Sequence, residues 1–165
     1  MKVTRRWNGW FWLTLPVLFF GLSAVLDRGL VREIPLPLAT SDLNGKPFAW
    51  ADTAERPVLL YFWATWCPLC GAMQNSLTSV DADHQVVTVA LQSGTESELR
   101  AYLQTQGLAW RVISDPAGLI GARYGLRGVP ALFFIDRHGR IRFTATGYTT
   151  EIGIRVRLWL TARMT

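Results

Sequence analysis

Cysteine and histidine are both scarce in this sequence, with two residues of each type among 165. Two cysteines cannot complete a tetrahedral four-cysteine zinc site, and neither His84 nor His138 lies at the spacing of a zinc finger. His84 lies in a polar connection and His138 in an expected turn, so we assign neither a catalytic role. Cys67 and Cys70 are therefore the candidate reactive residues of the chain.

A basic excess is missing from the part of the chain expected to fold. The net charge is +5, but residues 1–33 contain five Lys or Arg and two acidic residues, which accounts for +3. The remaining 132 residues contribute only +2. A nucleic-acid-binding protein concentrates positive charge on its folded domain, so we expect no nucleic-acid partner. The length allows one ordinary domain, and no internal repeat or low-complexity tract divides it.

Charged residues are also absent from residues 7–26, which follow Lys2, Arg5 and Arg6. Twenty uncharged residues in a helix can cross a hydrocarbon core about 30 Å thick. Tryptophans at positions 7, 10 and 12 cluster at the basic end, where indole rings prefer the membrane interface. The basic flank predicts that this end stays in the cytoplasm and that the following domain lies outside.

The competing interpretation of this segment is a cleaved signal peptide. Its Leu-Ser-Ala at 22–24 matches the small-residue cleavage pattern poorly, and the apolar run is longer than a usual signal core. We therefore favour the interpretation that residues 1–27 contain a short cytoplasmic segment and an uncleaved signal anchor. Residues 28–41, which contain Pro35 and Pro37, are expected to be an extended tether, and 42–165 the domain. Either interpretation exports the domain to a compartment where disulfide chemistry is expected.

The two cysteines occur in a Cys-X-X-Cys motif that directly follows an apolar run. Residues 58–64 are rich in strand-forming side chains, as in a central strand covered on both faces. Pro68 favours the first position of a helix, which places Cys67 just before the helix N-terminus. Orphan amide hydrogens and the helix dipole stabilise an anion there, and the thiolate is the nucleophile in disulfide exchange. Cys70, one turn later, is placed to be the resolving thiol.

Two other uses of this motif compete with redox catalysis. The pair can form an inert local disulfide in a non-catalytic adaptor, or it can bind and hand on Cu(I), which soft thiolates favour. The strand before the motif and the helix after it favour the redox interpretation. Turnover of insulin disulfides distinguishes the enzyme from the other classes, and copper retention by the reduced domain distinguishes the copper module.

Predicted strands and helices alternate through the rest of the chain, which indicates an α/β domain with a parallel pair joined by a crossover helix. Asn44-Gly45 is a strong hairpin signal. A capping box begins at Thr95, and Gly107 stops the helix that it opens. Asp115 is expected to be an N-cap followed by Pro at N1. The expected strands are 86–91, 110–113, 131–136 and 140–146, and the expected helices are 68–80, 96–106, 115–125 and 150–163.

Apolar spacing indicates how three of these elements present their side chains. In the helix from 68, one face carries Leu69, Met73, Leu77 and Val80, which we interpret as core rather than cofactor contacts. In the last strand, apolar side chains at 141, 143 and 145 alternate with polar ones, as in a half-buried antiparallel strand. The last helix carries four apolar residues on one side: Ile152, Val156, Trp159 and Leu160.

Two segments resemble the thioredoxin-like family. Residues 62–70, Phe-Trp-Ala-Thr-Trp-Cys-Pro-Leu-Cys, resemble its active-site segment, most closely in the membrane-tethered bacterial branch with TlpA, ResA, the cytochrome c maturation reductases and ScsD. Residues 124–136 resemble the family's cis-proline strand. The resemblance covers about residues 36–164 and implies a thioredoxin-like α/β fold: a mixed sheet with a parallel centre, an antiparallel C-terminal edge, helices on both faces and an N-terminal hairpin.

The resemblance also implies the roles of the site residues. Pro130 is expected to be cis and to face the disulfide, and Val129 to offer backbone groups to an extended substrate, which Trp66 and Pro68 also contact. The chain departs from the family at two positions. Tyr61 stands where classical thioredoxins carry a buried Asp, and Met73 where ResA-like proteins often carry a Glu. Both expected proton acceptors for the resolving thiol are therefore missing.

The resulting hypothesis is a periplasm-facing thiol–disulfide oxidoreductase, held in a bacterial inner membrane by its single N-terminal helix. Cys67 attacks a protein disulfide and Cys70 resolves the mixed disulfide. Because the dithiol is itself the redox centre, no metal or organic cofactor is implied. The uncharged Pro68-Leu69 pair gives the thiolate no strong charge partner, which favours a reductase over a strong oxidant. A reductase would be regenerated by a membrane electron donor of the DsbD type.

Overall fold

The computed structural model describes residues 40–48 and 56–164. The expected anchor at 1–27 and nearly all of the expected tether lie outside these residues. Within the two described ranges, no helix is both long enough and apolar enough to cross a membrane. The description below therefore concerns the domain that follows the expected tether.

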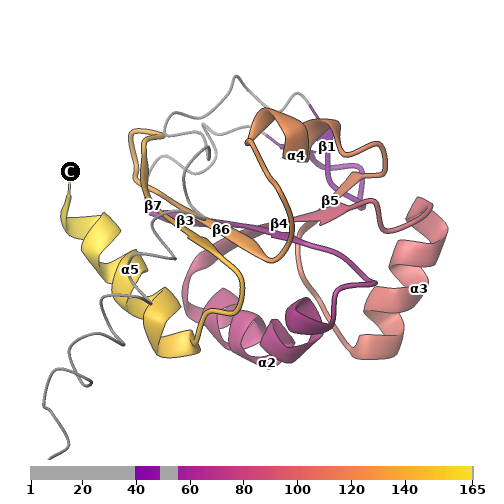
Figure 1. Ribbon diagram of the computed structural model, residues 1–165, viewed down its shortest axis with the longest axis horizontal. Helices are drawn as coiled ribbons and strands as arrows, with labels where there is room; N and C mark the ends of the chain where they lie inside the picture. The colour runs from indigo at the N-terminus through magenta and orange to yellow at the C-terminus, as the bar shows by residue number, and fades with distance from the viewer. Residues whose placement is uncertain (1–39, 49–55, 165) are drawn as a thin grey trace, which may run out of the picture.

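Five strands form the central mixed sheet, in the order β5-β4-β3-β6-β7. Strand β3 lies at its centre and is buried at every position because helices cover both faces (Figure 1). It runs parallel to β4 and antiparallel to β6. This confirms the predicted parallel part and antiparallel C-terminal part of the sheet. The strands are β3 (Val58–Trp63), β4 (Gln85–Leu91), β5 (Val112–Asp115), β6 (Ala131–Ile135) and β7 (Ile141–Thr146).

Helices cover the sheet unequally. Helices α2, α3 and α5 lie on one face, and the short helix α4 lies on the other (Figure 1). Alternate residues of β3 serve the two layers, since Leu59, Tyr61 and Trp63 join the core under α2, whereas Val58, Leu60 and Phe62 join the core under α4. The period of two along a strand produces this division. The helices are α2 (Pro68–Asp83), α3 (Glu96–Gln106), α4 (Leu119–Arg123) and α5 (Glu151–Arg163).

The predicted N-terminal hairpin is present and is attached to the edge of the sheet. Strands β1 (Thr40–Ser41) and β2 (Pro47–Phe48) pair antiparallel. Between them the Asp42 carboxylate accepts hydrogen bonds from the backbone of Asn44 and Lys46. The same carboxylate forms an ion pair with Arg111, 3.1 Å away and just before β5. The hairpin therefore extends the fold beside β5 and leaves the opposite edge, at β7, uncovered by it.

The prediction of Asp115 as an N-cap is wrong, although Pro116 does follow it. Asp115 is the last residue of β5, and Gly118 caps α4 in the left-handed region, at a φ of 71°. The buried Asp115 carboxylate instead accepts a hydrogen bond from the Gly121 amide, at 2.8 Å. The side chain thus satisfies an amide in the first turn of α4, but it does so from the end of β5 and not from the capping position itself.

Two predicted apolar faces are also corrected by packing. In β7, a register shift pairs Phe143 with Phe134 but Ile141 with Ile135, so Ile141 and Phe143 pack into different cores. An inserted residue of this kind breaks the alternation of a strand. In α2, Met73, Leu77 and Val80 are buried as predicted, whereas Leu69 is exposed.

Candidate active site

The Cys-X-X-Cys motif lies at the start of α2, just after the turn that follows β3, and its cysteines are joined by a disulfide. Helix α2 begins at Pro68 with Cys67 as its N-cap, which confirms the predicted helix start. The backbone amide of Cys70 donates a hydrogen bond to the Cys67 sulfur at 3.2 Å. Cys67 therefore caps the helix with its sulfur, in the place usually taken by a serine or aspartate oxygen.

The two cysteines differ in how they meet solvent. Cys67 is 7% exposed and Cys70 is 2% exposed. The side chains beside them are open, with Trp66 at 59% and Leu69 at 50% exposure, and Pro68 is also exposed. The disulfide therefore lies below an apolar rim, which suits contact with an apolar polypeptide segment better than with a small polar solute.

The loop before β6 faces the disulfide. The Val129–Pro130 peptide bond is cis, as predicted. The Val129 carbonyl oxygen lies 3.6 Å from the Cys67 sulfur. The Pro130 carbonyl accepts a hydrogen bond from the Gly147 amide at 2.8 Å, which ties this loop to the end of β7. The structure thus brings Val129 and Pro130, from a segment about 60 residues later, to the Cys67 sulfur and its sequence neighbours Trp66 and Pro68.

The loop after β4 holds the turn that carries the cysteines. The Ser93 hydroxyl accepts a hydrogen bond from the Thr65 amide at 3.1 Å, and the Gln92 carbonyl accepts one from the Trp66 indole at 3.1 Å. Sequence reasoning missed both residues. The available signal was their position directly after β4, because the carboxyl ends of adjacent parallel strands meet at one edge of a sheet.

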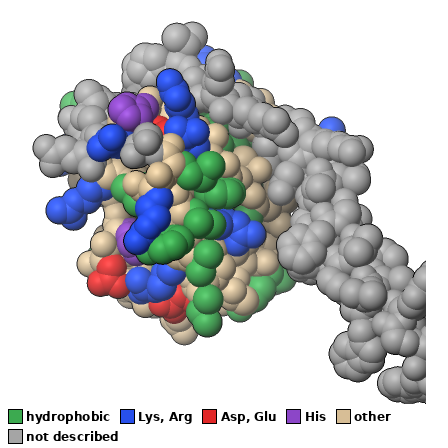
Figure 2. All heavy atoms as spheres, turned by 90° about the vertical axis from the view of Figure 1, so that its left-hand side faces the viewer, with side chains coloured by type: hydrophobic (Ala, Val, Ile, Leu, Met, Phe, Trp, Pro, Cys, Tyr) green, Lys and Arg blue, Asp and Glu red, His purple; other side chains and the backbone are tan. Residues whose placement is uncertain are grey.

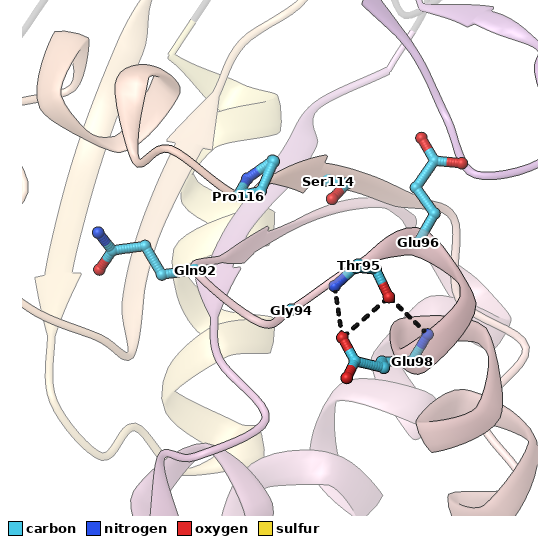
Figure 3. A pocket seen from close by; sticks show the side chains of 7 residues that line it. All are labelled: Gln92, Gly94, Thr95, Glu96, Glu98, Ser114 and Pro116. Atoms are coloured by element: carbon cyan, nitrogen blue, oxygen red, sulfur yellow. Dashed lines mark hydrogen bonds between the residues drawn. The ribbon is translucent and has the colours of Figure 1, made fainter.

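A pocket of about 560 Å³ lies beside this loop (Figure 3). Neither cysteine lines it. Thr95 and Glu98 bond to each other there in the predicted capping box, and these hydrogen bonds hold the pKa of the Glu98 carboxyl below its usual value. The pocket residues are Gln92, Gly94, Thr95, Glu96, Glu98, Ser114 and Pro116.

The two positions at which the family resemblance predicts a proton acceptor for Cys70 are occupied by buried side chains without a carboxylate. Tyr61 and Met73, which occupy the two acid positions, are both fully buried in the core that contains the disulfide. The Tyr61 hydroxyl has no hydrogen-bond partner among the described residues. Burial raises the pKa of Tyr61 far above its ordinary value, with a smaller contribution from Tyr102. Tyr61 is therefore neutral at physiological pH and is not a base for the Cys70 thiol.

Residues 32–144 match the model of the AhpC/TSA family. The chain belongs to this family. A thioredoxin-like protein of Haemophilus influenzae is 31% identical over 152 residues, covering 89% of this chain and 90% of that protein. The thiol:disulfide interchange protein DsbE of Escherichia coli K12 is 32% identical over 128 residues, covering 74% of this chain and 68% of that protein.

A solved structure places the same chemistry on this fold. The structure of a secreted Mycobacterium tuberculosis disulfide oxidoreductase, described as homologous to E. coli DsbE, matches with a TM-score of 0.63 and 26% identity. The match covers 73% of this chain and 93% of the other. With a disulfide-bonded Cys-X-X-Cys pair at the helix start, this AhpC/TSA protein is a thiol–disulfide oxidoreductase.

Proposed function

We propose that this chain is a membrane-anchored, periplasm-facing reductase of protein disulfides, with Cys67 as its nucleophile and Cys70 as its resolving thiol. The observation that carries the proposal is the position of Cys67. It caps α2 with its sulfur, is the more exposed of the two cysteines, and lies 3.6 Å from the Val129 carbonyl.

In the first step, the Cys67 thiolate attacks one sulfur of a substrate disulfide. The substrate S–S bond breaks, a mixed disulfide with Cys67 forms, and one substrate thiolate leaves. The Cys70 amide and the positive end of α2 stabilise the attacking thiolate. The substrate segment lies across Trp66 and Pro68, and its backbone bonds to the Val129 carbonyl beside Pro130.

In the second step, Cys70 attacks the Cys67 sulfur, which releases the second substrate thiolate and forms the disulfide seen here. Cys70 must lose a proton before this attack. Because Tyr61 is neutral and Met73 is apolar, the thiolate released in the first step is the acceptor that we assign for that proton. The reaction then consumes two electrons from the dithiol and leaves a reduced substrate.

The charges near Cys67 favour electron flow from the protein to its substrate. The residues between the two cysteines, Pro68 and Leu69, are both uncharged. A thiolate stabilised mainly by a helix terminus is less stable than one that is also paired with a cation, so its disulfide is a weaker oxidant. A membrane donor of the DsbD type, itself a dithiol, would return two electrons to the Cys67–Cys70 disulfide after each cycle.

The uncharged segment at 7–26 and its basic flank support the anchor. The catalytic part of the proposal is tested by the reduction of insulin by the full-length protein with dithiothreitol as donor. We expect turnover above the rate with dithiothreitol alone, and loss of that turnover in Cys67→Ser. Turnover equal to that of the Cys67→Ser variant would contradict the proposal.

A further inference from the structure

The large apolar side chains that remain exposed gather mainly in two places. Trp66, Leu69 and Tyr148 belong to the active-site segments and their neighbour after β7, where a substrate would lie. A second group lies on α5 or at its end, outside the proposed active site. Figure 2 shows the face that carries α5, with hydrophobic side chains gathered across it and Lys or Arg on both sides. This group comprises Ile152, Val156, Trp159 and Met164.

Helix α5 is apolar on two opposite sides. Ile152, Val156 and Trp159 are 76%, 49% and 53% exposed. At about 100° per residue they fall in one narrow stripe, which we call the outer stripe. Ile154 and Leu158 are buried on the opposite side of the helix, against the sheet and α2. A helix that is apolar on both sides is typical of a helix covered on both sides, and the outer stripe is covered by none of the described residues.

Arginines flank the outer stripe. Arg155, on one side, is bonded to Glu151 and Asp83. The Arg163 guanidinium stacks over the Trp159 ring at 3.5 Å. Arg157 lies farther round the helix, with its guanidinium over the Phe134 ring. Neither Arg157 nor Arg163 forms an ion pair with a carboxylate of the described residues. An apolar stripe with a tryptophan and the unneutralised Arg163 stacked on it complements an anionic lipid surface, into which indole and guanidinium groups insert together.

We propose that α5 docks on the anionic surface of the membrane through its outer stripe. This inference rests on the anchoring part of the proposed function. The expected anchor ends at residue 27 and the described domain begins at Thr40. A chain of this length spans no more than roughly 45 Å, so the domain stays within reach of the bilayer. Tethering raises the effective concentration of the lipid surface, so three apolar side chains are enough for docking.

A second copy of the chain fits the outer stripe less well than lipid does. Pairing two α5 helices would bring the arginines of both copies into the same interface. The acidic side chain at the start of the helix, Glu151, is already bonded to Arg155 and Ser79 and is not available to neutralise them. Because α5 is bonded to α2 through Arg155 and Asp83, docking would also set how the disulfide at the start of α2 is presented to a membrane donor.

The test uses the full-length protein in vesicles of phosphatidylcholine with or without phosphatidylglycerol, the lipids carrying brominated chains that quench tryptophan. The chain has eight tryptophans, so the signal of Trp159 is taken as the difference between the wild type and Trp159→Phe. We expect this difference signal to be quenched in vesicles that contain phosphatidylglycerol. The quenching should disappear in vesicles of phosphatidylcholine alone, in 1 M salt, and in the Arg163→Glu variant. Leu119→Gln, which removes an exposed apolar side chain from α4, should leave the signal unchanged.

Alkaline carbonate extraction of the same vesicles reports the anchor separately. Anchored protein whose Trp159 signal is not quenched in phosphatidylglycerol vesicles would overturn the docking of α5 and leave the anchor standing. Extracted protein that still shows lipid-dependent quenching of Trp159 at neutral pH would support α5 docking and overturn the anchor. A wild type that dimerises in lipid-free detergent, and becomes monomeric in Trp159→Ser, would assign the outer stripe to a second copy and contradict the proposal.

Discussion

The Cys70 amide and the Cys67 sulfur form a hydrogen bond of 3.2 Å across the first turn of α2. The bond is a helix cap made by sulfur, and it places the nucleophilic candidate where the helix offers its unpaired amides. The same amide is available to a thiolate when the disulfide is reduced. Because Cys67 and not Cys70 occupies the capping position, we expect Cys67 to attack the substrate first and Cys70 to resolve the mixed disulfide.

The first prediction concerns the division of labour between the cysteines. Cys67→Ser should abolish the reduction of insulin, whereas Cys70→Ser should accumulate a mixed disulfide with insulin because no thiol resolves it. Non-reducing electrophoresis followed by mass spectrometry detects the trapped species. Faster alkylation of Cys70 than of Cys67 in the reduced protein at neutral pH would reverse the assignment.

The second prediction concerns the reduction potential of the Cys67–Cys70 pair. We expect a value nearer the thioredoxin value of about −270 mV than the DsbA value of about −120 mV, because the helix terminus is the main stabilising influence on the thiolate. Equilibration with glutathione buffers, followed by alkylation and mass spectrometry, measures it. A potential near that of DsbA, with the protein found oxidised in cells, would contradict the reductase direction while leaving the oxidoreductase class intact.

The third prediction concerns topology. The segment at 7–26 should hold the chain in the membrane with residues 28–165 on the outside. In spheroplasts, added protease should degrade the domain, and carbonate extraction should leave the undigested full-length chain in the membrane fraction. A soluble product shortened by the length of the anchor would show that the segment is cleaved.

The fourth prediction concerns Ser93, whose hydroxyl accepts from the Thr65 amide. Ser93→Ala leaves that amide without its partner and should lower the free energy of unfolding by about 1–3 kcal/mol. Because Thr65 lies two residues before Cys67, the rate of Cys67 alkylation should also change. Urea unfolding and alkylation kinetics measure the two effects. Ser97→Ala, in an exposed position of α3, is the matched control and should lower the free energy of unfolding by less than about 0.5 kcal/mol.

The fifth prediction concerns Asp136, whose carboxylate accepts from the backbone of His138 and Arg140 and from the Arg142 side chain at 2.7 Å. Burial raises the pKa of Asp136, but these hydrogen bonds together outweigh it and hold the pKa below its usual value. The ionised carboxylate therefore stabilises the fold above the unfolded pKa of about 3.9, and this contribution is lost as the pH falls below it through the folded pKa.

Asp136→Asn should lower the free energy of unfolding at pH 7 by about 1–3 kcal/mol and flatten its dependence on pH below about 4. Urea unfolding of both proteins between pH 2.5 and pH 7 measures the difference, with the other carboxylates common to both. Arg142→Met should also destabilise the protein at pH 7, since it leaves the buried carboxylate without its cation. A difference in the free energy of unfolding between the wild type and Asp136→Asn that stays constant from pH 2.5 to pH 7 would contradict the prediction.

Local sequence patterns determined much of this protein before any tertiary contact is considered. The apolar run before Cys67, the proline after it and the capping box at Thr95 specify their elements, because each acts within a few residues along the chain. The same holds for two hairpin turns built alike. Asp42 and Asp136 each begin a turn whose fourth residue is a glycine with positive φ, 75° at Gly45 and 78° at Gly139, and each carboxylate bonds the amides two and four residues later.

Only the tertiary structure decided which of the competing local options was used. Helix α5 offers two apolar stripes, and the sheet with α2 buries Ile154 and Leu158 rather than Ile152 and Trp159. Asp115 has the chemistry of an N-cap, yet β5 continues through it and Gly118 takes the capping position, so its carboxylate bonds the Gly121 amide from the end of the strand. The contact of Ser93 with Thr65 spans 28 residues. Such choices depend on the shapes of surfaces that meet only after the strands have assembled, and no spacing along the chain encodes those shapes directly.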